Sequence, residues 1–205
     1  MEKTCIIVAN GDFSKTDIKK NNGDLLIVAD SDNYKLLNID DIDIFVGDFD
    51  SITQVPKNKE FIKLPSEKND TDTMYAIKYA IKKGYKKFVL YGFLGKRFDH
   101  SLANIQSLNY IKDKGFAGVI YDTTNNLCFK IIKNETIEFN NTFTGTISGF
   151  SLTNKSVISI EGLKYPLDHK VITNNYPLCI SNEFVGENSK ITVYQGSVLV
   201  IFEKR

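Results

Sequence analysis

The 205-residue sequence has few of the residues that mark several common protein classes. Its three cysteines, Cys5, Cys128 and Cys179, fit neither a disulfide framework nor a zinc site, because their number is odd and their spacing is wide. Cys5 and Cys179 lie in apolar runs, so we expect them to be buried free thiols. The two histidines are not spaced as a metal-binding pair, which argues against a histidine-based zinc centre.

Long hydrophobic runs and an excess of one charge are also absent. No apolar run is long enough to cross a bilayer, and the N-terminal stretch MEKTCIIVANGDF lacks the features of a signal peptide, so we expect a cytoplasmic protein. The 26 basic and 25 acidic residues give a formal net charge of +1, which predicts neither a nucleic acid nor a membrane as a partner. Neither a Walker A loop nor a G-x-G-x-x-G motif occurs, which disfavours P-loop kinases and dinucleotide dehydrogenases.

The first part of the chain alternates between strand-like and helical patterns. Its strand-like runs have apolar centres and polar ends, as is typical of parallel strands covered on both faces. These runs are 5–10, 25–30, 42–51, 61–65, 86–93 and 118–122. Helices are predicted over 70–84 and over 98–115, the second with Leu102, Ile105, Leu108 and Ile111 on one face. We therefore expect an α/β domain with an open, mostly parallel sheet over residues 1–122.

After residue 122 the pattern changes to short apolar runs punctuated by glycine and asparagine, without a convincing helix. This texture predicts an all-β domain, an antiparallel sandwich or barrel, over residues 123–205. No internal repeat and no low-complexity linker separates the two parts.

Two pairs of carboxylates follow structural elements of the first part. Asp48 and Asp50 lie in the polar end of the strand-like run 42–51, just past its apolar stretch IDIFV, and Asp70 and Asp72 stand where a helix begins. Taken singly, the first pair fits a turn and the second pair fits helix caps. Together, at the edge of an open α/β sheet where ligands bind, converging carboxylates indicate a bound cation. Ligands that are all oxygen suit Mg²⁺ shared with a polyphosphate.

A third segment, YGFLGKRFDHSLAN, runs from a strand through a turn into a helix. Gly92 and Gly95 allow the backbone to approach a ligand closely, and the helix start offers N–H groups to a phosphate. Arg97 adds a fork of donors that matches phosphate oxygens. Asp99 and His100 follow, and each alone also fits a structural role in the first turn of the helix.

These segments together resemble the thiamine pyrophosphokinase family in its bacterial form. The resemblance extends over nearly the whole chain and depends on the order and spacing of pieces that are each weak alone. The pieces are ADSDN (29–33), VGDFDSI (46–52), KNDTDTMYAI (68–77), GKRFDHSLANI (95–105), GLKYPL (162–167), SNEF (181–184) and GSVLVIF (196–202).

The resemblance implies a transferase of the kinase type, a thiamine diphosphokinase. Such an enzyme moves the pyrophosphoryl group of ATP to the hydroxyl of thiamine and yields thiamine diphosphate and AMP, with Mg²⁺ as cofactor. It also implies a homodimer with active sites at the interface. In that arrangement residues 1–122 hold ATP and Mg²⁺, and residues 123–205 contribute thiamine binding and dimer contacts.

The resemblance also assigns roles to individual positions. The metal-binding candidates are Asp48, Asp50, Asp70 and Asp72. The catalytic candidates are Asp70, Asp72, Arg97 and Asp99. The ATP-binding candidates are Asp30, Ser31, Arg97, His100 and Asn104. The thiamine-binding candidates are Tyr165, Ser181 and Asn182. Without the resemblance, Tyr165 would fit packing in the core or in a dimer, and Ser181 and Asn182 would fit a turn.

Two departures from the family pattern and several alternatives stay open. Asp32 adds a charge near the nucleotide, and Lys96 replaces a glycine, so that it is either strained by a positive φ or adds a phosphate contact. The sequence does not choose the general base among Asp70, Asp72 and Asp99.

Two alternatives to a thiamine pyrophosphokinase stay open. One is a different Mg²⁺-dependent transferase or nucleotide hydrolase, and the other is a non-catalytic module that binds thiamine or a nucleotide.

Overall fold

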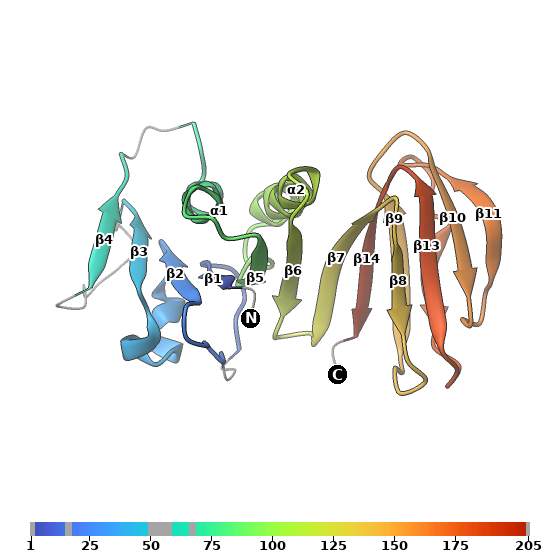
Figure 1. The fold of residues 1–205 in the computed structure, drawn as a ribbon, viewed down its shortest axis with the longest axis horizontal. Helices are drawn as coiled ribbons and strands as arrows, with labels where there is room; N and C mark the ends of the chain where they lie inside the picture. The colour runs from blue at the N-terminus through green and yellow to red at the C-terminus, as the bar shows by residue number, and fades with distance from the viewer. Residues whose placement is uncertain (1–2, 15–17, 49–58, 66–68, 204–205) are drawn as a thin grey trace. The chain divides into compact units, whose positions relative to one another are not determined.

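The computed structural model describes residues 3–14, 18–48, 59–65 and 69–203. The chain divides into two compact units, residues 1–125 and residues 126–205. Each unit has its own arrangement of strands (Figure 1). Among the described residues, no helix has the length and apolar character needed to cross a membrane.

The first unit contains a six-stranded sheet in the order β6-β5-β1-β2-β3-β4. Every neighbouring pair in this series is parallel, as the apolar runs predict. The strands are β1 (Thr4–Val8), β2 (Leu25–Ala29), β3 (Ile44–Gly47), β4 (Glu60–Lys63), β5 (Lys87–Tyr91) and β6 (Ala117–Asp122). Strand β1 lies between β2 and β5 and runs parallel to both. The loops that follow these three strands therefore emerge at the same edge of the sheet.

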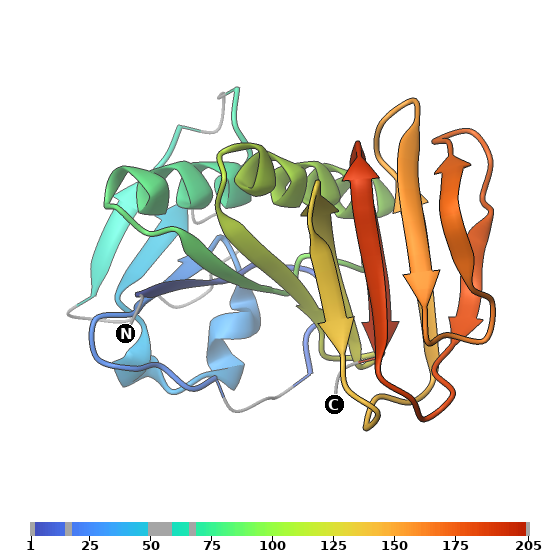
Figure 2. The same ribbon diagram turned by 45° about the vertical axis from the view of Figure 1, so that its right-hand side comes forward.

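Both faces of this sheet are covered. Helices α1 (Asp72–Lys82) and α2 (Phe98–Asp113) lie on one face, and the 3₁₀ turns η1 (Asp32–Leu36) and η2 (Ile39–Asp41) lie on the other, as Figure 2 makes visible. On the η1 side, Tyr34 packs with Ile6, Val28 and other strand residues in one buried cluster. Burial on both sides explains why the strands are continuously apolar instead of alternating.

The start of α1 and the buried face of α2 differ from simple expectation. The N-cap of α1 is Thr71, whose side chain accepts a hydrogen bond from the Met74 N–H at 3.1 Å, so neither Asp70 nor Asp72 caps this helix. The apolar face predicted for α2 is not buried as a whole, because Leu102 is 50% exposed. The buried face instead combines Leu108 and Ile111 with the polar Asn104, since this helix also borders a cavity.

The second unit consists of two antiparallel four-stranded sheets, in the orders β12-β9-β14-β7 and β11-β10-β13-β8. The rings of Phe139 and Phe202 join the two sheets at a centroid distance of 4.9 Å, so the core of this unit lies between them. The strands are β7 (Leu127–Lys133), β8 (Thr136–Phe139), β9 (Thr146–Ser151), β10 (Ser156–Glu161), β11 (Leu167–Ile172), β12 (Cys179–Glu183), β13 (Ser189–Gln195) and β14 (Ser197–Glu203). No helix interrupts the described part of this unit, as predicted.

All three cysteines are buried, and Cys5 and Cys179 are free thiols, which confirms the prediction for these two. Burial raises the pKa of both of these thiols. Buried thiols with raised pKa values are typical of packing residues.

Candidate functional site

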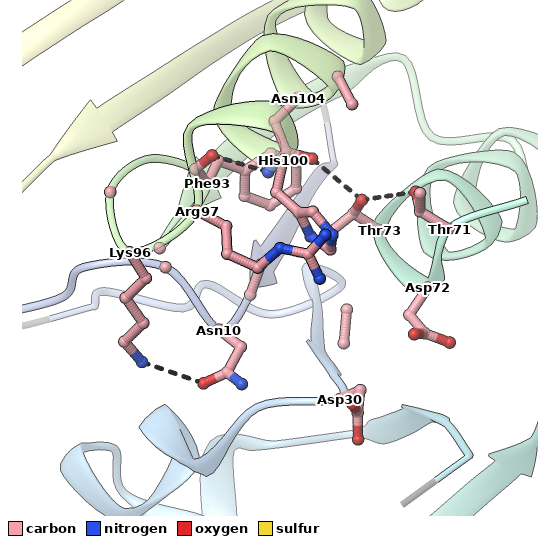
Figure 3. A pocket seen from close by; sticks show the side chains of 16 residues that line it. Asn10, Asp30, Thr71, Asp72, Thr73, Phe93, Lys96, Arg97, His100 and Asn104 are labelled. Carbon is pink, nitrogen blue, oxygen red and sulfur yellow. Dashed lines mark hydrogen bonds between the residues drawn. The ribbon is translucent and has the colours of Figure 1, made fainter. Parts of the chain in front are cut away.

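A cavity of about 360 Å³ lies in the first unit, beyond the carboxyl ends of β1, β2 and β5 (Figure 3). Its wall comes from the loops after these three strands and from the first turns of α1 and α2. This is the edge of an open α/β sheet at which ligands bind. The lining residues are Ala9, Asn10, Gly11, Ala29, Asp30, Thr71, Asp72, Thr73, Gly92, Phe93, Gly95, Lys96, Arg97, His100, Ala103 and Asn104.

Close contact between two loops shapes one side of this cavity. The Gly11 N–H donates to the Gly92 carbonyl at 2.7 Å, and the Asp12 N–H donates to the Leu94 carbonyl at 2.6 Å. A Cβ atom at Gly95, whose φ is +84°, would collide with the Asp12 side chain. The sequence therefore needs glycine at this point, and the loop after β5 lies directly against the loop after β1.

Five of the residues predicted for the site line this one cavity. They come from distant positions in the sequence and from different elements: Asp30, Asp72, Arg97, His100 and Asn104. Asp30 has a φ of 37°, a left-handed conformation that costs on the order of 1–3 kcal/mol in residues other than glycine. It is held there by its own N–H, which donates to the Val46 carbonyl at 2.8 Å. Strain of this kind is typical of functional sites.

Asn104 acts as a brace between the loop after β5 and the start of α1. Its amide nitrogen donates to the Phe93 carbonyl at 2.7 Å, and its amide oxygen accepts from the Thr73 hydroxyl at 3.1 Å. The Thr73 hydroxyl also lies 2.9 Å from that of Thr71, which completes the chain of bonds seen in Figure 3. Asn104 is only 8% exposed, so its main effect is to fix the shape of the cavity.

Other predicted residues lie beside the cavity without lining it. Ser31 is fully buried, and its hydroxyl donates to the Ala9 carbonyl at 2.9 Å. Both oxygens of Asp70 accept from the Lys78 ammonium, each at 2.8 Å. Asp48 follows β3, whose last residue, Gly47, packs against Asp30. Asp50 lies outside the described residues.

Arg97 and Asp99 form an ion pair at the start of α2. The arginine donates through Nη2 to Asp99 Oδ2 at 2.6 Å and through Nε to Asp99 Oδ1 at 3.2 Å. The hydrogen bond from Arg97 holds the pKa of the Asp99 carboxyl below its usual range. The positive charge of Arg97 is thus balanced within the pair.

The described carboxylates fit a magnesium ion of a particular kind. No three His, Cys, Asp or Glu side chains of the described ranges are grouped closely enough to hold a metal alone. Two carboxylates, Asp30 and Asp72, line the cavity. Magnesium is usually bound by one or two carboxylates, with water and substrate phosphates completing its shell. The set therefore suits an ion shared with a phosphorylated ligand and not a protein-only cage.

The three candidates for thiamine binding lie together in the second unit. Asn182 accepts from the Tyr165 N–H at 3.0 Å and donates to the Tyr165 carbonyl at 2.8 Å. Asn182 is 6% exposed, whereas the Tyr165 side chain is 56% exposed. Ser181 has a φ of 56°, and its N–H donates to the Ser148 hydroxyl at 3.0 Å. Asn182 is thus a buried anchor that fixes the backbone beneath an exposed aromatic ring.

Sequence reasoning missed several residues that line the cavity, above all Asn10 and Thr73. Asn10 follows β1, so the rule that ligands bind at the carboxyl ends of parallel strands would have identified it. Thr73 offers no such signal, because its role depends on Asn104, which is far away in the sequence.

Two family models match the chain, one in each unit. The model described as "Thiamin pyrophosphokinase, catalytic domain" matches residues 17–120. The model described as "Thiamin pyrophosphokinase, vitamin B1 binding domain" matches residues 133–198. The cavity residues from Asp30 onward fall in the first match, and Tyr165, Ser181 and Asn182 fall in the second.

Individual relatives agree with these models. A protein of Bacillus subtilis (strain 168) named thiamine pyrophosphokinase is 29% identical in an alignment 169 residues long, which covers 76% of this chain and 75% of that protein. A crystal structure of thiamine pyrophosphokinase from Bacillus subtilis matches with a TM-score of 0.84 and 25% identity, covering 98% of this chain and 99% of the other. A structure of thiamin pyrophosphokinase from Candida albicans matches in fold, with a TM-score of 0.77 and 18% identity over 99% of this chain and 90% of the other.

Proposed function

Since the chain belongs to the thiamine pyrophosphokinase family, we propose that the cavity of its first unit is the site at which ATP is bound and cleaved. The activity is transfer of the pyrophosphoryl group of ATP to thiamine. The observation that carries the assignment of the site is the meeting of Asp30, Asp72 and Arg97 in one cavity at the ligand-binding edge of the sheet.

The reaction requires one bond to form and one to break. The hydroxyl oxygen of thiamine attacks the β-phosphorus of ATP, the bond from that phosphorus to the bridging oxygen of the α-phosphate breaks, and AMP leaves with the bridging oxygen. The hydroxyl proton passes to a base. As in other phosphoryl transfers, positioning and neutralisation of charge supply most of the catalysis.

We assign Asp30 and Asp72 to Mg²⁺ that arrives with the nucleotide, with Asp48 and Asp70 as further candidates near the same edge. Mg²⁺ would screen the negative charge of the phosphates when it is bound. The carboxylates repel ATP without a metal, so nucleotide binding should depend on Mg²⁺. Asp50 stays a candidate from the family resemblance alone.

Among the three candidates for the general base, the surroundings favour Asp72. The Asp99 carboxyl is a weaker base, because Arg97 lowers its pKa. Both oxygens of Asp70 are engaged by Lys78. Asp72 lines the cavity at the first position of α1, so its carboxyl oxygen that is not bound to Mg²⁺ is the best placed of the three candidates to accept a proton from a bound alcohol.

Thiamine is assigned to the second unit, at Tyr165, Ser181 and Asn182. The exposed face of the Tyr165 ring suits the cationic thiazolium ring. Asn182 holds that ring in place through both polar groups of the Tyr165 backbone.

We further propose that the protein acts as a homodimer whose active sites lie at the interface. Support comes from large apolar side chains that the second unit exposes around β11 and β12. Val171, Tyr176, Leu178 and Ile180 are 50%, 67%, 41% and 46% exposed, respectively. Burial of such side chains against a second copy of the chain would stabilise a dimer.

A product assay tests the proposed function. The protein is incubated with ATP, Mg²⁺ and thiamine, and the products are separated. We expect AMP and thiamine diphosphate, with no AMP when thiamine is omitted. ADP as the nucleotide product would indicate an ordinary kinase, and AMP released without thiamine would indicate a hydrolase. If the protein binds thiamine or ATP without turnover, it is a binding module.

A further inference from the structure

The described basic residues of the cavity differ in how their charges are balanced. The Arg97 guanidinium is paired with Asp99 through two hydrogen bonds. The Lys96 ammonium instead donates to a neutral group, the side-chain oxygen of Asn10, at 3.2 Å. Within the described ranges no carboxylate lies at ion-pair distance from Lys96. Lys96 therefore brings a positive charge to the cavity that these residues do not neutralise.

The backbone of Lys96 is held in an unfavourable conformation. Its φ is 48°, and such a conformation costs on the order of 1–2 kcal/mol in a residue with a Cβ atom. Of the six described residues other than glycine with positive φ, four (Asp30, Asn126, Asn134 and His169) are of the types Asn, Asp and His, which adopt it most often. Lysine has no such tolerance, so a glycine at position 96 would relax the turn. The chain thus keeps an unfavourable backbone conformation at Lys96, a charged residue that lines the cavity.

A purely structural role for Lys96 would be to tie the loop after β5 to the loop after β1. That connection exists without it, because the Gly11 and Asp12 N–H groups already bond to the Gly92 and Leu94 carbonyls. The Lys96–Asn10 hydrogen bond is exposed, and the two short backbone bonds join the loops without it. A structural tie therefore does not account for a strained lysine at this position.

We propose that Lys96 is a binding residue for the polyphosphate chain of the Mg²⁺-bound nucleotide. Asn10 holds the ammonium at the rim of the cavity, and the ammonium exchanges this neutral partner for phosphate oxygens when the nucleotide enters. An ammonium is a compact point charge that suits phosphate oxygens. This inference rests on the proposed function and adds to it a cationic contact that does not depend on breaking the Arg97–Asp99 pair.

The test measures binding of α,β-methylene ATP with Mg²⁺ by calorimetry, in the absence of thiamine. This analogue keeps the charge of ATP but cannot be cleaved at the bond that the reaction breaks. We expect Lys96→Gln and Lys96→Gly each to raise the dissociation constant about tenfold, the usual value of a hydrogen bond to a charged group. Lys96→Gly should also raise the melting temperature, because the turn relaxes.

Two control variants separate charge and strain from the site. Lys86→Gln removes the same charge from an exposed position before β5, at the end of that strand away from the cavity. Asn134→Gly places a glycine at another position with positive φ, in a turn of the second unit. Both should bind the analogue like the wild type.

Each outcome decides the inference. Binding within twofold of wild type in both Lys96 variants overturns it, and an equal loss in Lys86→Gln replaces it with a general effect of net charge. A failure of the proposed function gives a different result. In that case the Lys96 variants still bind the analogue more weakly than the wild type, but the wild-type protein makes no thiamine diphosphate.

Discussion

Asp70 and Asp72 stand two residues apart, yet their side chains have different surroundings. Asp72 lines the cavity, whereas both oxygens of Asp70 accept from Lys78. The equal spacing of the pair in the sequence hides this difference, because the start of α1 falls between the two residues, at Thr71. Position on the folded element, and not proximity in sequence, determines which carboxylate can reach a ligand.

This difference predicts unequal effects of the two isosteric substitutions. Asp72→Asn should lower kcat by about 100-fold or more, the range for loss of a general base or metal ligand. Asp70→Asn should lower it by less, because Lys78 already occupies that carboxylate. Steady-state release of AMP measures both, and circular dichroism should show the same fold. Equal losses of kcat in the two variants would contradict the distinction.

Tyr165 and Asn182 should also separate in their effects. Tyr165→Leu removes an exposed ring, so we expect a several-fold higher KM for thiamine with little change in stability. Asn182→Ala removes a buried amide that bonds to both backbone groups of Tyr165, so it should raise the same KM and also lower the free energy of unfolding by about 1–3 kcal/mol. Urea unfolding gives the second quantity. A stability loss as large in Tyr165→Leu would indicate a packing role for the ring.

At the scale of elements, the beginning of α1 links stability to the cavity. Thr71 caps this helix and also lines the cavity. Thr71→Ala should lower the free energy of unfolding by about 1 kcal/mol, because the Met74 N–H loses its acceptor. Thr71→Ser keeps the hydroxyl and should remain close to wild type in urea unfolding. If both substitutions destabilise equally, the methyl group and not the cap would be responsible.

The loop before β2 carries a pH-sensitive contribution to stability. Asp24 accepts from the Thr4 N–H at 2.7 Å and from the Asn21 N–H at 2.9 Å. Burial opposes ionisation of this carboxyl, but these donors bring its pKa below the usual range. A carboxyl with a lowered pKa stabilises the folded state above its unfolded pKa of about 3.9, and the contribution is lost as the pH falls through the lower, folded pKa.

Removal of this carboxyl should therefore flatten the acid branch of the stability curve. Asp24→Asn should lower the free energy of unfolding by about 1 kcal/mol at pH 7, with a smaller difference from wild type as the pH falls below about 4. Urea unfolding over a pH series measures this change. Asp40→Asn removes an exposed carboxylate of the same unit and is the matched control. A difference from wild type that stays constant with pH would show that ionisation of Asp24 is not involved.

The elements were easier to predict from the sequence than the cavity. Strands such as Ile44–Gly47 are apolar because both faces of the sheet are covered, so their composition predicts their burial directly. The residues that line the cavity have a weaker sequence pattern. Leu102 follows the apolar spacing of α2 but is exposed, and the polar Asn104 is buried because Phe93 and Thr73 satisfy its amide. Such partners come from distant segments, which local patterns do not reveal.

At the scale of the whole molecule, the two units carry different halves of the proposed chemistry. The residues proposed to bind ATP belong to residues 1–125, and those proposed to bind thiamine belong to residues 126–205. If active sites combine two copies of the chain, a mixture of Asp72→Asn protein and Tyr165→Leu/Asn182→Ala protein should regain activity after subunit exchange. Each variant alone should stay weak. Size-exclusion chromatography with light scattering tests the dimer itself, and no recovery in mixed dimers would place each site within one chain.

The position of β1 between β2 and β5 has a kinetic consequence. Ala9, Asn10 and Gly11 line the cavity together with residues of the loop after β5, and the two loops meet only after β1 has paired with β5, across a long stretch of intervening chain. Pairing between segments so far apart in sequence is slow. During refolding, helix signals from α1 and α2 should therefore recover first. Nucleotide binding should recover later. The rate at which a fluorescent nucleotide analogue becomes bound during refolding would therefore report the pairing of β1 with β5.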